Sequence, residues 1–96
     1  MTTIHLKPLT GHFAENKDIA RDIRVDTLTP ILAKGGKVTI DFSGVSGATQ
    51  SFIHALISEL FRIHGSEVLS LISFKNCNFT IQKVITIVTE YMQEAE

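Results

Sequence analysis

Ser51 and His54 are the residues whose types and spacing most directly suggest chemistry in this 96-residue chain. A separation of three residues places two side chains on one helix face, about one turn apart. A serine beside a histidine could hydrolyse an ester, but the sequence lacks a Gly-x-Ser-x-Gly motif and a matching aspartate to orient the histidine. We therefore predict that the chain is not an enzyme and that His54 is a structural histidine. Ser51 either stabilises the start of its helix, as an N-cap or first-turn residue, or is phosphorylated.

The remaining reactive side chains do not form a metal or cofactor motif. The single cysteine, Cys77, excludes an internal disulfide and a thiolate zinc site, and we expect it to pack as a small buried hydrophobe. Asp41 has no second carboxylate close in sequence, so we predict that it bonds to the loop backbone together with Ser43. Gly44 and Gly47 precede a helix, but the phosphate-binding patterns Gly-x-Gly-x-x-Gly and Gly-Lys-Ser/Thr are absent. We expect no cofactor and no metal.

Composition and charge describe an ordinary globular chain. Hydrophobic residues make up 44% of the sequence and the formal net charge is −1, which predicts a single folded domain over residues 1–96. Basic residues alternate with aspartates between positions 17 and 26, as on a solvated helix face, so we expect no nucleic-acid partner. The N-terminus lacks a secretory signal pattern, and no apolar stretch approaches the roughly 20 residues that span a bilayer. We expect a cytoplasmic protein of bacterial type that contacts no membrane.

Apolar periodicity predicts strands that alternate with helices along the chain. This order favours a mainly parallel sheet with right-handed crossovers, in a single small α/β domain. Pro30 removes a donor inside the first helix, so we expect a kink or break there. The expected order is a strand at Thr3–Leu6, a helix at Asn16–Ala33, a strand at Lys37–Phe42, a helix at Gln50–His64 ended by Gly65, a strand at Val68–Phe74, and a helix from about Ile81 to Met92 that Asn78 or Thr80 caps.

Two polar loops follow the second and third predicted strands, at Asp41–Ser51 and Lys75–Thr80. Loops that leave the carboxyl ends of parallel strands gather on one edge of the sheet, where ligands bind. A helix start at this edge adds free amides and a partial positive charge, which favour an anion. We therefore predict one edge that binds a partner or ligand. Its residues are Thr49, Gln50, Ser51, His54, Asn76 and Asn78.

Three segments of the chain resemble the STAS-like bacterial domain family of unknown function. They are Asp41-Phe42-Ser43-Gly44-Val45, Thr49-Gln50-Ser51-Phe52 and Ser73-Phe74-Lys75-Asn76-Cys77, and the resemblance extends over about residues 11–91. The family is a relative of the anti-sigma-factor antagonist domain, whose members pair with serine kinases of the histidine-kinase-like ATPase fold. Those antagonists carry an Asp-Ser-Ser-Gly motif whose second serine is phosphorylated. Laid on this chain, the motif falls on residues 49–52, where only Ser51 matches, and Phe52 in place of the glycine is expected to crowd the approach of a kinase.

The resemblance implies a non-enzymatic regulatory module that binds a protein partner. The implied partner is a histidine-kinase-like ATPase or serine kinase, and Ser51 is the implied phosphorylation site. One alternative is a sensor of a nucleotide or small ligand that uses the same loop edge. A second alternative is a structural subunit or homodimer that associates through exposed apolar residues outside the main helix stripes, such as Val25, Ile87 and Tyr91.

Overall fold

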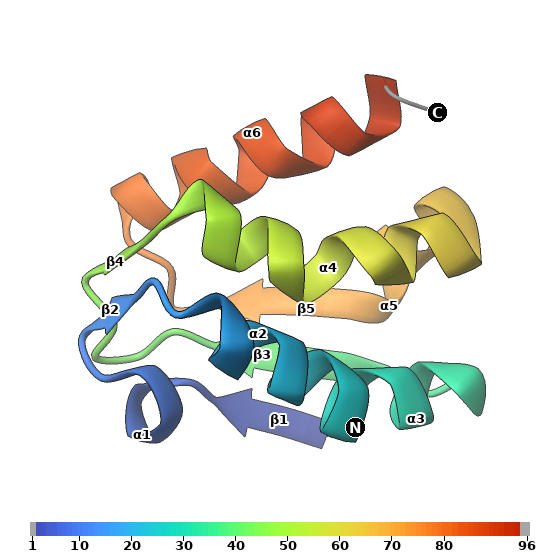
Figure 1. Ribbon diagram of the computed structural model, residues 1–96, viewed down its shortest axis with the longest axis horizontal. Helices are drawn as coiled ribbons and strands as arrows, with labels where there is room; N and C mark the ends of the chain where they lie inside the picture. Colours follow the sequence, from blue (N-terminus) through green and yellow to red (C-terminus); the bar gives the residue numbers. More distant parts are fainter. Residues whose placement is uncertain (1, 95–96) are drawn as a thin grey trace.

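A three-stranded parallel sheet lies beneath the helices of this protein (Figure 1). The structure is a computed structural model, and it describes residues 2–94. Residues pair in register across the sheet, so that Ile40 stands beside Ile4 on one side and Phe74 on the other. The predicted α/β fold with a mainly parallel sheet is confirmed. In spatial order the strands are β1 (Thr2–His5), β3 (Val38–Asp41) and β5 (Ile72–Lys75).

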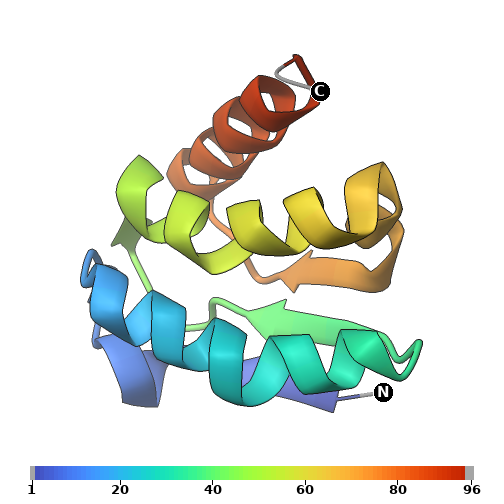
Figure 2. The same cartoon turned by 45° about the vertical axis from the view of Figure 1, so that its right-hand side comes forward.

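Helices connect these strands and follow the last of them, as the sequence predicts (Figures 1 and 2). The long segments are α2 (Lys17–Ile23), which runs through a π-helical turn (Arg24–Leu28) into α3 (Thr29–Ala33), then α4 (Gln50–His64) and α6 (Phe79–Glu94). The short segments are α1 (Lys7–Thr10), a 3-10 turn (Gly65–Glu67), α5 (Val68–Leu71), and the strands β2 (Phe13–Ala14) and β4 (Gly47–Ala48). Helix α4 lies between α2 and α6 and packs on both.

The strand order explains why the helices gather on one face. The chain crosses from β1 to β3 and then from β3 to β5, always in the same direction across the sheet. A connection between parallel strands is right-handed in nearly all proteins, so two successive crossovers in one direction place their helices on the same face. Figure 1 shows α2 and α4 together in front of the strands.

The two faces of the sheet differ in polarity, because side chains alternate along each strand. On the face beneath the helices, Val38 and Ile40 are completely buried. On the opposite face, Thr39 and Asp41 of the central strand are buried, while the side chains beside them are exposed. Parallel sheets usually carry helices on both faces, but this second face is polar and no helix within residues 2–94 covers it. The exposed residues of this polar face are Thr3, His5, Ser73 and Lys75.

The helix predicted for residues 16–33 is one helical stretch that changes its hydrogen-bond pattern in the middle. Asn16 caps its start as predicted, since its side-chain oxygen accepts hydrogen bonds from two first-turn amides at 2.9 and 3.4 Å. The interruption expected at Pro30 takes the form of the π-helical turn just before it, where the amide of Thr29 donates to the carbonyl of Arg24. A π turn is wider than an α turn, so it accommodates the proline ring while the chain stays helical.

The strand predicted at Val68–Phe74 is wrong in its first half. The strand begins at Ile72, and residues Val68–Leu71 form the helical turn α5. Val68 of the turn and Ile72 of the strand are both buried, so both halves of this run contribute to the core. A short apolar run therefore does not distinguish a strand from a buried helical turn. Gly65 ends α4 as predicted, with a left-handed φ of 70°.

The small sheet of β2 and β4, which the sequence does not predict, positions the segment that leads into α4. The two strands pair in parallel, with Phe13 beside Gly47. The Phe13 ring lies so close that a Cβ atom at position 47 would come within 2.8 Å of it, so any side chain there would force the ring to move. The amides of Ser46 and Thr49 donate to carbonyls of the N-terminal segment at 2.7 and 3.0 Å. The N-terminal segment therefore determines where α4 begins.

Replacing Phe52 with alanine should remove a completely buried side chain from α4. The lost contacts and the cavity left behind should lower the free energy of unfolding by about 3–5 kcal/mol, out of the roughly 5–15 kcal/mol of a typical domain. Urea unfolding followed by circular dichroism measures the difference. Phe79→Ala is the matched control, because this side chain is 73% exposed and its loss should cost less than about 1 kcal/mol. Equal losses in the two variants would contradict the described core.

Candidate functional site

The Asp41 carboxylate connects all three strands at the carboxyl edge of the sheet. Its Oδ1 atom accepts hydrogen bonds from the backbone amide of Ser43 at 2.8 Å and from the side-chain amide of Asn76 at 2.9 Å. Its Oδ2 atom lies 3.3 Å from Nδ1 of His5. The hydrogen bond from Asn76, followed by the one from the Ser43 amide, holds the pKa of Asp41 below its usual value. The predicted turn role of Asp41 with Ser43 is confirmed.

Asn76 and Asn78, in the loop after β5, hold neighbouring segments together. Asn76 has a φ of 58°, a left-handed backbone conformation that asparagine tolerates, and its side chain bonds to Asp41. The Oδ1 atom of Asn78 accepts a hydrogen bond from a first-turn amide of α6 at 2.8 Å, so Asn78 rather than Thr80 caps this helix. Its Nδ2 atom donates to the carbonyl of Ser46 at 2.8 Å. The loops after β3 and β5 therefore meet at one edge, as predicted.

Thr49, and not Ser51, is the N-cap of α4. Its Oγ1 atom accepts a hydrogen bond from the amide of Phe52 at 3.0 Å. Ser51 is the second residue of the helix, and its exposed hydroxyl has no hydrogen-bond partner among residues 2–94. The expectation that Phe52 would crowd the approach to Ser51 is wrong, because adjacent helix residues point about 100° apart and Phe52 points into the core. The Ser51 hydroxyl is therefore open to solvent.

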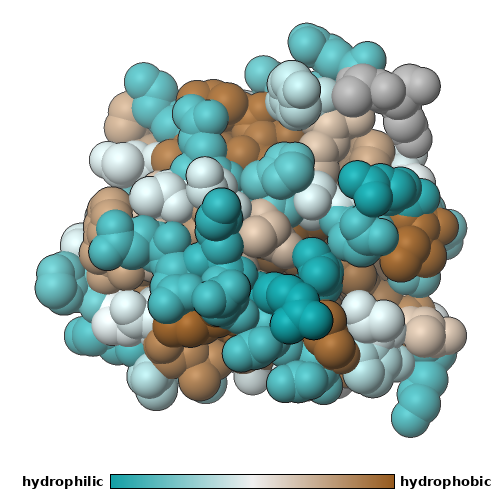
Figure 3. Space-filling view, in the orientation of Figure 1, coloured by the Kyte–Doolittle hydropathy of each residue, from teal (hydrophilic) through white to brown (hydrophobic). Residues whose placement is uncertain are grey.

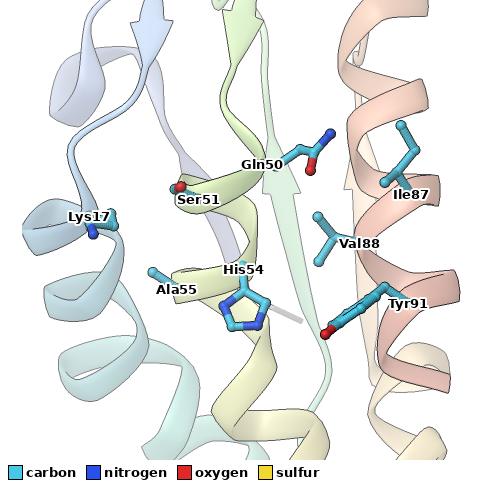
Figure 4. Close-up of a pocket in the computed structure, with 8 residues that line it drawn as sticks. All are labelled: Lys17, Gln50, Ser51, His54, Ala55, Ile87, Val88 and Tyr91. Atoms are coloured by element: carbon cyan, nitrogen blue, oxygen red, sulfur yellow. The ribbon is translucent and has the colours of Figure 1, made fainter. Parts of the chain in front are cut away.

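The outward side of α4 forms part of an open groove between α2 and α6 (Figure 4). A hollow of about 410 Å³ lies at the N-terminal end of α4. Gln50 points toward α6, whereas Ser51 lies on the side of α4 that faces Lys17 of α2. The Tyr91 ring extends from α6 toward His54. The residues that line this hollow are Lys17, Gln50, Ser51, His54, Ala55, Ile87, Val88 and Tyr91.

A second hollow of about 380 Å³ continues along α4 and shares His54 and Tyr91 with the first. We call the two hollows together the α4–α6 groove. Arg62, near the C-terminal end of α4, lines the second hollow and donates a hydrogen bond to Oε2 of Glu59 at 2.9 Å. The other residues of the second hollow are Ser58, Phe61, Gly65 and Met92.

The binding surface predicted from the sequence divides into two parts in the structure. Thr49 lies at the start of α4 as its cap, and Asn76 and Asn78 lie in the loops at the strand ends, outside the groove. These two asparagines do not reach the groove because their side-chain amides are bonded to other loop segments. The involvement of all these residues in binding stays a prediction. The predicted residues that line the groove are Gln50, Ser51 and His54.

His54 differs from its prediction as a structural histidine. Its ring is exposed and forms no hydrogen bond or ion pair with the residues that the structure describes. Ile53, Leu56 and Ile57 occupy the core-facing side of α4, so His54 falls on the outward side. Within residues 2–94, no hydrogen bond joins His54 to Ser51.

Sequence reasoning missed the walls that α2 and α6 contribute to the groove. The sequence places Lys17 on a solvated helix face, and no sequence signal indicates that this face borders α4. The sequence also predicts exposed apolar side chains at Val25, Ile87 and Tyr91, and this is confirmed, with exposed fractions of 47%, 47% and 65%. The position of Ile87 and Tyr91 beside His54 depends on how α6 packs on α4, which the order of elements does not specify.

The described part of the chain contains neither a metal-binding cluster nor a membrane-spanning helix. Among residues 2–94, no group of His, Cys, Asp and Glu side chains is arranged to hold a metal ion. No helix in this range is long and apolar enough to cross a membrane. Cys77 is partly buried, and this burial, together with the charge of Asp41, raises the pKa of its thiol. The thiol therefore stays protonated at neutral pH.

Parallel strands lead through polar loops into capped helices, and an exposed serine lies in the first turn of α4. This arrangement defines the class of the protein as a small α/β domain with a parallel sheet. The chain belongs to the STAS-like domain family of unknown function, whose family model matches residues 20–82. The matched region runs from α2 to the first turn of α6 and confirms the resemblance found in the sequence. No curated protein and no solved structure matches the chain.

Asp41→Asn should remove a carboxyl group whose pKa is lower in the folded chain than in the unfolded chain. Such a carboxylate stabilises the fold above its unfolded-state pKa, near 3.8, and this contribution is lost as the pH falls through the lower folded-state value. We expect the wild type to melt several degrees above the variant at neutral pH, and the gap to shrink between about pH 4 and pH 2. Thermal melting at a series of pH values measures this gap.

The control for this experiment is Asp22→Asn, which changes an exposed aspartate whose ion pair with Arg21 spans 3.9 Å. Its melting temperature should stay close to that of the wild type at every pH, because an exposed pair of this length contributes little. A gap between Asp41→Asn and the wild type that stays constant down to about pH 2 would contradict the role given to this carboxylate.

Proposed function

We propose that this STAS-like domain is a regulatory protein-binding module that does not itself catalyse a reaction. Its docking surface is the N-terminal end of the α4–α6 groove, centred on Gln50, Ser51 and His54. Its partner is a protein of the histidine-kinase-like ATPase class, with which the related anti-sigma-factor antagonists pair. Phosphorylation of Ser51 by this partner switches the interaction.

The exposed hydroxyl of Ser51 is the observation that carries this proposal. The hydroxyl lies in the first turn of α4, two residues after the cap Thr49. It forms no hydrogen bond with another residue in the described range, and it borders the groove. A kinase needs a hydroxyl that it can reach without unfolding the helix. The burial of Phe52 leaves the approach to Ser51 free of a large side chain at that position.

The surroundings of Ser51 suit binding better than catalysis. His54 stands one turn away but forms no hydrogen bond with Ser51 that would activate its hydroxyl. Asp41, the carboxylate with a lowered pKa, is engaged by Asn76, Ser43 and His5 at the strand ends. The groove is open to solvent along α4, as a surface for another protein would be.

A phosphate on Ser51 would change the surface and leave the fold intact. It would add a charge of about −1.5 to −2 at neutral pH. The backbone amides of Gln50 and Ser51 have no acceptor among residues 2–94, and the N-terminal end of a helix favours negative charge. The new charge would therefore be tolerated by α4 while it altered the rim of the groove.

Ser51→Glu should lower affinity for the ATPase partner at least tenfold without lowering the melting temperature, because it adds charge at the groove and at a helix start. The partner is first identified by affinity capture and mass spectrometry, and its affinity is then measured by titration calorimetry. Incubation of the purified pair with Mg-ATP should place phosphate on Ser51, and Ser51→Ala should accept none.

Ser70→Glu is the matched control, since this exposed serine lies on α5, at the opposite end of α4 from Ser51 (Figure 1). Its affinity for the partner should equal that of the wild type. Capture of no such ATPase, or phosphate found on a residue other than Ser51, would refute the proposal. A nucleotide that raises the melting temperature of the domain alone would assign it to ligand sensing instead.

A further inference from the structure

The α4–α6 groove is long enough to hold a short segment of secondary structure. Residues of α4 line it at nearly every turn, from Gln50 through His54 and Ser58 to Arg62. At 1.5 Å per residue this distance is about 18 Å, or more than three helical turns. Helix α6 runs beside it and provides the wall on the other side.

The wall formed by α6 is apolar and partly open to solvent. Ile87 and Tyr91, one turn apart, keep about half or more of their surface exposed, at 47% and 65%. Val88 and Met92, the next residues along the helix, are buried beneath them and also line the groove. Hydrophobic side chains gather over α6 in the upper part of Figure 3. The groove therefore offers apolar contacts over two turns of α6.

The walls of the groove determine which secondary structure it can bind. An extended peptide needs backbone partners, which an exposed sheet edge supplies. Here both walls are helices, whose backbone groups in the helix interior already bond within the helix. An amphipathic helix satisfies its own backbone and needs only side-chain contacts, so it is the form that fits between α4 and α6.

The charges along the groove favour an acidic occupant at one end. Lys17 lines the N-terminal hollow and forms no ion pair with the residues that the structure describes. The unbonded amides of Gln50 and Ser51 lie at the same end and carry partial positive charge. No aspartate or glutamate lines either hollow, although Asp18 is exposed beside Lys17. At the other end, the charge of Arg62 is partly compensated by Glu59.

We infer that the α4–α6 groove binds an amphipathic helix of the partner protein, whose apolar stripe packs on Ile87 and Tyr91 and whose acidic residue pairs with Lys17. This inference rests on the proposed protein-binding function and specifies the part of the partner that docks. It also gives phosphorylation a physical effect, because a phosphate on Ser51 repels the acidic end of that helix. Ile87, Tyr91 and Lys17 lie outside residues 20–82, the region that the family model matches.

Two helix-stapled peptides of about 16 residues test the inference directly. Both carry leucines along one face, and they differ only in a terminal glutamate or lysine at the end that would meet Lys17. Fluorescence anisotropy measures affinity, and amide chemical shifts in a ¹⁵N-labelled domain locate the peptide. The glutamate peptide should bind at least tenfold more tightly, with the largest shifts at His54 and Tyr91.

Variants of the domain separate the apolar and the charged contributions. Tyr91→Ala should weaken both peptides about tenfold, and Lys17→Glu should reverse the preference between them. Ser51→Glu should weaken only the glutamate peptide. Leu9→Ala and Lys34→Glu are the matched controls, because these exposed residues lie on α1 and at the end of α3 and line neither hollow of the groove, and both should leave the two affinities unchanged.

Several results would overturn the inference. Equal affinity for the two peptides, no binding of either, or shifts confined to the polar face of the sheet would each do so. A dimer seen by light scattering that Tyr91→Ala converts to monomers would assign the groove to a second copy of the chain. An ATPase partner that binds without displacing the glutamate peptide would refute this docking mode alone. If the peptides bind but no ATPase partner is found, the groove still binds a helix and the proposed partner class is refuted.

Discussion

The right-handed crossover between parallel strands is the constraint on which the rest of this structure depends. Because the chain moves across the sheet in one direction, from β1 to β3 to β5, both crossovers place their helices above the same face. Helix α4 then has neighbours on both sides, α2 and α6, and only its outward side remains free. The crossovers thus place α2 beside α4, and the second wall of the groove depends on how α6, which follows the last strand, packs on α4. The opposite face of the sheet, with no helix to pack against, carries polar side chains.

The side chains at the edge of the sheet and those along the groove differ in their contacts, although the same loops connect them. Asp41, Asn76 and Asn78 use their polar atoms to fix the strand ends and the start of α6. The bonds of Asn78 join the start of α6 to the loop that precedes α4. Ser51 has no such structural bond. The residues that hold the scaffold are engaged with one another, whereas the side chains of Ser51 and His54 in the groove form no hydrogen bond with another residue in the described range 2–94.

The sequence predicts most of the fold but only part of the site, for physical reasons that particular residues illustrate. Helix Gln50–His64 is predicted to its last residue, because its apolar stripe is wide and Gly65 ends it. The turn Val68–Leu71 is not, since a short run with three apolar residues fits a helical turn as well as a strand. The roles of Lys17 and Asn76 depend on neighbours that are distant in sequence, and a local pattern carries no information about them.

The two outer strands of the sheet have a consequence for how copies of this protein meet at high concentration. Each of β1 and β5 is only four residues long and, within residues 2–94, pairs on one side alone. An unpaired strand edge is a template for fibrous aggregation, which proteins resist by keeping such edges short and placing lysine on them. β5 ends at Lys75 and β1 ends at His5, with both side chains exposed. The sheet therefore offers few free backbone groups for strand pairing between molecules.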